Sequence, residues 1–197
     1  TTYTFVMNDV PETGKEIEIG KINGAGKPLA GATIVIKQGD ATIKRWTTDT
    51  ANKTFKIAPG TYTFHESSAP KDYQCVKDFD FTIDGEGRIT IDSSITYASV
   101  NGNKLVVTDD HQPIKVTVYK TWDSGTVAKA VKLQLYVDGK TYGDPVTLKS
   151  SDGKNWSYSW NEVPYSYGNH YVVKEENSDV FYPIETDNHT ITYYEKY

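Results

Sequence analysis

Three charged residues in the first half of the chain have the chemistry to form a covalent cross-link. Lys21 lies near the end of EIEIGKI, Glu66 ends TYTFHE, and Asp109 ends KLVVTD. Side chains alternate between the two faces of a strand, so each of these residues shares a face with the apolar residues before it. Ions are costly to bury on apolar faces, which raises the question of what these three side chains do there.

An amine and two carboxyl groups that meet in a pocket of low polarity can condense to an amide. Low polarity favours the neutral, nucleophilic form of lysine and raises the pKa of carboxyl groups, so that a glutamic acid can stay protonated. We therefore expect Lys21 to attack the carboxyl carbon of Asp109 while Glu66 transfers protons, with loss of one water. Enforced proximity makes this slow condensation feasible. The next residue, Asp110, is an alternative acceptor, but the alternation places its side chain on the outer face.

The elements that position these residues are expected to be strands. Alternating apolar runs recur along the chain between turns such as DGEG and SDGK, and no segment has a sustained helical period. The expected strands are 16–22, 32–38, 54–59, 61–66, 79–84, 88–92 and 104–109, then 114–122, 131–139, 144–150, 156–160, 170–176 and 189–195. This pattern predicts an all-β chain that forms two β-sandwich domains in tandem.

The two halves, 15–112 and 113–197, carry the same pattern of charged residues. In the second half Lys120 ends VTVYK, as the first lysine ends IEIGK, and Glu175 ends YVVKE, as the first glutamate ends YTFHE. A simpler interpretation is that these charges lie at sheet ends and reach water. Their repetition in both halves instead favours two copies of one module with a shared chemical role.

The first half resembles the CnaB-type domains of Gram-positive surface adhesins and pilins, a family with self-forming intramolecular isopeptide bonds. The resemblance covers about residues 15–113 and rests on GKPLAGATIVI, GTYTFHESSAPKDY, FTIDGEGRITI and KLVVTD. It implies a reverse Ig-like β-sandwich with Lys21 as nucleophile, Glu66 as catalytic carboxyl and Asp109 as acceptor. Many family members use asparagine as the acceptor, and aspartate also occurs.

The second half is similar to the repeat-region B domains of the collagen adhesin family, through KTWDSG, VDGK, WSYSWNEVP and YVVKEE. The similarity implies that Lys120 and Glu175 take the nucleophile and catalytic positions. The family usually closes with an asparagine strand, but this chain reads HTITYYEKY and has Tyr193 at the matching position. Tyrosine offers no carboxyl or amide carbon to an amine, so we expect an ion pair and no bond. Asp187 and Asn188 are alternative acceptors if the register slips.

Residues 1–14, TTYTFVMNDVPETG, precede the first module and have two interpretations. Tyr3, Phe5 and Met7 alternate before Asp9, as in the final strand of a preceding domain. VPETG resembles a sortase sorting motif, but a domain follows it where a working signal needs an apolar segment and a basic tail. We therefore favour a strand or linker.

The composition excludes several functions. A net charge of −5 without a dense Lys/Arg cluster argues against nucleic acid. Cys75 is the single cysteine, so no intrachain disulfide or cysteine-rich zinc site is expected. The four histidines are scattered, which argues against a metal site, and no cofactor is expected. No apolar run is long enough to span a membrane.

These features predict an extracellular stalk or spacer of a cell-wall-anchored adhesin or pilin, with neighbouring domains of the same surface protein as partners. Its only catalysis would be the single self-linking turnover. The alternative is an adhesin module that binds a host extracellular-matrix or cell-surface protein or glycan through Trp156, Trp160, Tyr165 and Tyr167, although such residues more often pack in a core. A glycosidase fits least, because its acids would follow strand ends of separate modules.

Overall fold

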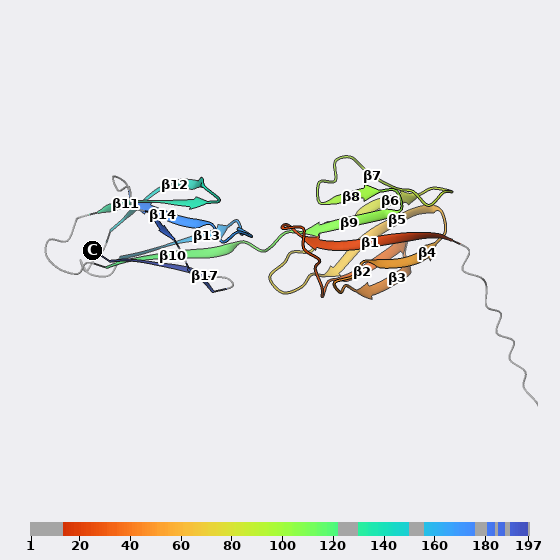
Figure 1. Cartoon of the computed structure of the whole chain (residues 1–197), viewed down its shortest axis with the longest axis horizontal. Coiled ribbons are helices and arrows are strands. Elements are labelled where there is room, and N and C mark those ends of the chain that lie inside the picture. Colours follow the sequence, from red (N-terminus) through yellow and green to blue (C-terminus); the bar gives the residue numbers. More distant parts are fainter. Residues whose placement is uncertain are drawn as a thin grey trace, which may run out of the picture. The chain divides into compact units, whose positions relative to one another are not determined.

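The regular elements of the described residues are all strands (Figure 1). The computed structural model describes residues 14–121, 130–149 and 156–175, together with the backbone of 181–183, 185–187 and 190–196. The chain divides between His111 and Gln112 into two compact units. No helix in this part of the chain is long and apolar enough to cross a membrane.

The first unit is a sandwich of two sheets. One sheet has the order β4 (Lys53–Ile57), β1 (Lys15–Asn23), β9 (Lys104–Asp109) and β8 (Ala98–Asn101). The other has the order β3 (Ala41–Thr47), β2 (Thr33–Gln38), β5 (Gly60–Ser68), β6 (Phe79–Ile83) and β7 (Ile89–Ile91). The first and last strands of this unit, β1 and β9, are parallel neighbours, and Figure 1 shows them side by side.

Alternation along the strands builds the core between these sheets. Buried apolar side chains from both sheets meet there, among them Ile17, Ile19, Ile34, Ile36, Tyr62, Phe64, Phe81, Leu105 and Val107. The aromatic rings of Phe64 and Phe79 stack with centroids 5.1 Å apart. Lys21, Glu66 and Asp109 continue the same inward faces and are buried with the apolar residues. The fold therefore places three ionisable groups at the edge of an apolar core.

The second unit repeats this topology. One sheet has the order β13 (Trp156–Val163), β10 (Ile114–Thr121), β17 (Thr190–Lys196) and β16 (Glu185–Asp187). The other has the order β12 (Lys140–Leu148), β11 (Val131–Val137), β14 (Tyr171–Glu175) and β15 (Phe181–Pro183). The first and last strands, β10 and β17, are again parallel neighbours. The shared strand order agrees with two copies of one module.

Two features expected from the sequence lie outside the described residues. These are residues 1–13, which hold Asp9 and all of VPETG except its glycine, and the alternative acceptor Asn188. Asp187 is described only in its backbone, at the end of β16, where it pairs with Thr190.

Candidate cross-linking site

Three strands bring the side chains of Lys21, Glu66 and Asp109 together inside the first unit. The Nζ atom of Lys21 lies 3.0 Å from Oε2 of Glu66 and contacts Oδ1 of Asp109. The side chains are 2%, 0% and 0% exposed, respectively, so water is almost excluded. These are the three residues that the sequence singled out.

The strand register explains why the lysine reaches both acids. In the parallel pair of β1 and β9, Lys21 lies opposite Val107 and Asn23 lies opposite Asp109. The acceptor is therefore one inward-facing position further along β9, within reach of the long lysine side chain. Glu66 comes from β5 in the facing sheet and approaches the pair from across the sandwich.

Burial changes the protonation of the acceptor. Loss of solvent raises the pKa of Asp109 to about 7, and the charge of Glu66 and a hydrogen bond shared with it act in the same direction. The hydrogen bond and charge of Lys21 oppose the rise without cancelling it. The ring of Phe64 lies 5.8 Å from Nζ of Lys21 and forms an apolar wall of the pocket. A substantial fraction of Asp109 is therefore neutral near pH 7.

Two carboxyl oxygens of the site have no N–H donor. Oε1 of Glu66 and Oδ2 of Asp109 are buried, and no hydrogen-bond donor of the described residues reaches them. Two buried acceptors are costly when both are ionised, but a proton held between the two carboxyl groups satisfies both. The cluster is therefore costly as a set of ions.

Glu66 receives a further hydrogen bond that sequence reasoning missed. The backbone N–H of Val76 donates to Oε2 of Glu66 at 3.0 Å. A backbone donor carries no side-chain signature, so neither composition nor alternation could have indicated it. The segment that contains Val76 follows the APKDY stretch between β5 and β6.

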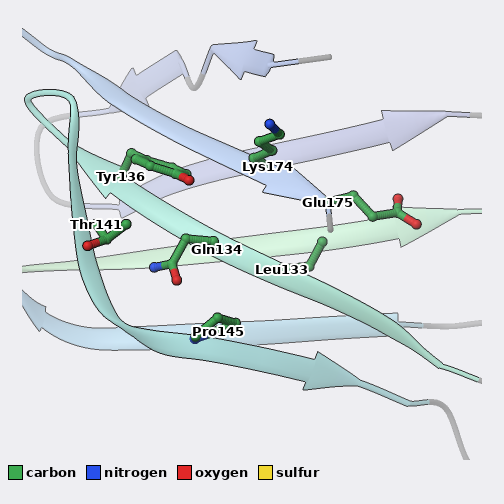
Figure 2. Close-up of a pocket in the computed structure, with 7 residues that line it drawn as sticks. All are labelled: Leu133, Gln134, Tyr136, Thr141, Pro145, Lys174 and Glu175. Carbon is green, nitrogen blue, oxygen red and sulfur yellow. The ribbon is translucent and has the colours of Figure 1, made fainter. Parts of the chain in front are cut away.

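The second unit also places a buried lysine against a glutamate. The side chain of Lys120 is 1% exposed, and its Nζ atom lies 2.8 Å from Oε2 of Glu175, whose side chain is 19% exposed. Glu175 also lines a surface pocket of about 270 Å³ over β11, β12 and β14 (Figure 2). Water therefore reaches Glu175 but not Glu66, so the two glutamates differ in their access to solvent.

The register of the last strand differs from the expectation for Tyr193. Tyr193 lies opposite Val118, and Glu195 lies opposite Lys120. In the first unit the acceptor lies opposite the residue two places after the lysine. The residue two places after Lys120 is Trp122, which lies outside the described residues, so the structure does not describe its neighbour on the last strand. The expectation that this domain stays unlinked remains a prediction.

Other residues named from the sequence have clear positions. Asp110 is exposed, on the outer face as its alternation predicted. Trp156 and Trp160 are buried in the core of the second unit, so they offer no exposed binding surface. The rings of Tyr165 and Tyr167 are half-buried and pack edge to face, 5.0 Å apart. Among the described residues no three His, Cys, Asp or Glu side chains gather as metal ligands.

The fold and the buried lysine sites define a class of protein, the tandem prealbumin-like β-sandwich. Residues 15–99 match the SpaA prealbumin-like fold domain, and residues 116–193 match the Cna protein B-type domain. The chain therefore carries a SpaA-type prealbumin-like domain and a Cna protein B-type domain in tandem.

Solved structures with similarity to this chain include proteins of Lactobacillus rhamnosus and Bacillus anthracis. The C-terminal fragment of the pilus adhesin SpaC from Lactobacillus rhamnosus GG is 16% identical over 93% of this chain and 97% of its own, with a TM-score of 0.42. The Bacillus anthracis TIE protein is 21% identical over 92% of this chain, with a TM-score of 0.41. This chain covers 34% of that protein's chain. No curated protein matches the chain. The identification therefore rests on the two family matches.

Proposed function

We propose that this chain is a structural stalk segment of a cell-wall-anchored adhesin or pilin, and that an autocatalytic amide bond between Lys21 and Asp109 locks its first domain. The observation that carries the proposal is a buried lysine amine in contact with two buried carboxyl groups. Such a cluster is costly as a set of ions but is well arranged for condensation.

The reaction balances within the three side chains. The neutral Lys21 amine attacks the carboxyl carbon of the neutral Asp109 acid, while Glu66 gives a proton to an Asp109 oxygen and then takes one from the nitrogen. When the C–O bond of the tetrahedral intermediate breaks, Glu66 protonates the departing hydroxyl, which leaves as water, and recovers its proton from the oxygen that stays. The nitrogen has lost one hydrogen, the departing hydroxyl has gained one, an amide remains, and Glu66 ends in its starting form. The raised pKa of Asp109 helps, because a neutral carboxyl carbon is the better electrophile.

The bond would determine how the first domain carries tension. The lysine is on the first strand and the aspartate on the last, 88 residues apart. A force that enters along β1 would pass through the amide into the end of β9 and leave the segment between them unloaded. By analogy with a disulfide that closes a loop of this length, the bond would stabilise the domain by about 4–5 kcal/mol.

This role fits a protein on the outside of a Gram-positive cell, where neighbouring domains of the same polypeptide are the immediate partners. A structural link formed once needs no cofactor and no turnover. The second domain, with its ion pair of Lys120 and Glu175, would act as a non-covalent spacer. Binding of a host ligand has less support, since both candidate tryptophans are buried.

Single-molecule stretching of the purified chain tests the mechanical role. In the wild type we expect the second domain to unfold and extend in full. The bond should prevent the 88 residues between Lys21 and Asp109 from adding to the measured increase in chain length. Asp109→Ala should add that loop to the extension. A wild-type chain that extends by its full length would contradict the proposal.

A further inference from the structure

The chain between β5 and β6 places a backbone donor on the general acid of the proposed reaction. Oε2 of Glu66 accepts two hydrogen bonds, from Nζ of Lys21 and from the N–H of Val76, each at 3.0 Å. Its other oxygen, Oε1, has no N–H donor among the described residues. The two oxygens of one carboxyl group therefore have different surroundings.

This asymmetry distinguishes the oxygen of Glu66 that can exchange a proton. An oxygen that already accepts two N–H hydrogen bonds has its lone pairs in use. Oε1 is then the atom available to pass a proton during the proposed reaction, and Oδ2 of Asp109 likewise has no donor among the described residues. The lysine contacts the other oxygen of Asp109, Oδ1.

The segment around Val76 is tied to the end of the acceptor strand. We define residues 73–76 as the closing segment. The N–H of Gln74 donates to the carbonyl of Asp110 at 3.0 Å, and Tyr73 forms a β-bridge with His111. Asn23, opposite Asp109 in the ladder, donates from its side chain to the Tyr73 hydroxyl at 3.2 Å. The closing segment therefore contacts the residues just beyond both ends of the future bond.

We propose that the closing segment positions Glu66, through the Val76 N–H, and does so once the last strand has docked. This inference rests on the proposed Lys21–Asp109 condensation. The anchors at Asp110 and His111 exist only when β9 lies beside β1, so Glu66 is oriented only in a completed sandwich. The reaction is thereby restricted to the correctly folded domain. Val76 is a positioning residue and takes no part in the bond changes.

The experiment compares variants that differ in this one donor. Val76→Pro removes the N–H, and Val76→Ala shortens the side chain but keeps it. Each full chain is made by cell-free translation, sampled over time, quenched in acid and weighed by intact mass. We expect Val76→Ala to lose water at the wild-type rate. We expect Val76→Pro to lose it about tenfold more slowly or worse, since positioned proton transfer contributes about 10²–10⁴-fold.

A matched backbone variant distinguishes loss of the N–H donor from a folding defect caused by Val76→Pro. Replacing Val76 by its α-hydroxy analogue keeps the side chain and exchanges only the amide N–H for an ester oxygen. Tryptophan fluorescence confirms folding at each time point. A folded ester or proline variant that links at the wild-type rate overturns this inference and leaves the proposed bond intact. A wild-type chain that never loses water overturns the proposed bond itself, and this inference with it.

Discussion

At the scale of residues, the proposed condensation depends on a fully buried glutamate, Glu66, that contacts the lysine amine. Glu66 is the only one of the three reactive residues that is unchanged by the proposed condensation, so its role is separable from the bond. We predict that Glu66→Ala leaves Lys21 and Asp109 unlinked in a folded chain. Peptide mapping checks this, because a linked pair survives digestion as one branched peptide. Recovery of that peptide from the variant would rule out Glu66 as the proton carrier.

The raised pKa of Asp109 leads to a pH prediction. Its value in the folded domain is about 7, above the ordinary value of 3.8. The neutral, electrophilic form is therefore favoured below this value and lost as the pH rises through it. We predict that the linking rate of newly made wild-type chain falls as the pH increases above about 7. Rates measured in buffers of constant ionic strength test this, and a rate that keeps rising with pH would point to an ionised acceptor.

The burial of the three side chains could be predicted from the sequence, and the backbone hydrogen bond to one of them could not. Strand alternation alone assigned Lys21, Glu66 and Asp109 to inner faces, because each continues an apolar series. The strand registers that bring them together could not be read in this way. The N–H of Val76 was missed, since every non-proline residue has one and only the path of the chain aims it.

At the scale of elements, the central strands were predictable and the edges were not. KLVVTD matches β9 from Lys104 to Asp109, and it has the strict alternation of a half-buried strand. β3 was not predicted because ATIKRWT is exposed along most of its length at a sheet edge and lacks an apolar face. β8, ASVN, was not predicted either, because it is a short edge strand whose side chains are mostly exposed. Edge strands are defined by their neighbour's hydrogen bonds, which the sequence does not display.

The strand β14 allows a prediction for the second domain. Glu175 neutralises the buried Lys120, so Glu175→Ala removes one partner of a largely buried ion pair. We expect this change to lower the free energy of unfolding of the second domain by about 1–3 kcal/mol. Urea unfolding measures it, with the exposed Asp144→Ala on β12 as a control expected to change little. An unchanged midpoint for Glu175→Ala would mean that Lys120 is satisfied without it.

At the scale of the whole molecule, the two units should differ in the interactions that stabilise them. The first would be closed by a covalent bond and the second by packing and an ion pair. We predict that Asp109→Ala lowers the stability of the first domain by about 4–5 kcal/mol and leaves the second unchanged. Guanidinium unfolding followed by residue-specific hydrogen exchange separates the two. Equal loss in both domains would indicate a general folding defect, and no loss in either would argue against the bond.

The most direct test of the central claim is the intact mass of the purified wild-type chain at high accuracy. The account predicts a mass lower than that of the sequence by one water, from the Lys21–Asp109 bond alone. A deficit of two waters would contradict the unlinked second domain and implicate an acid such as Glu195, which lies opposite Lys120. A further loss of ammonia would implicate an asparagine. A mass equal to that of the sequence would contradict the covalent lock, and the three buried side chains would then form only a polar cluster.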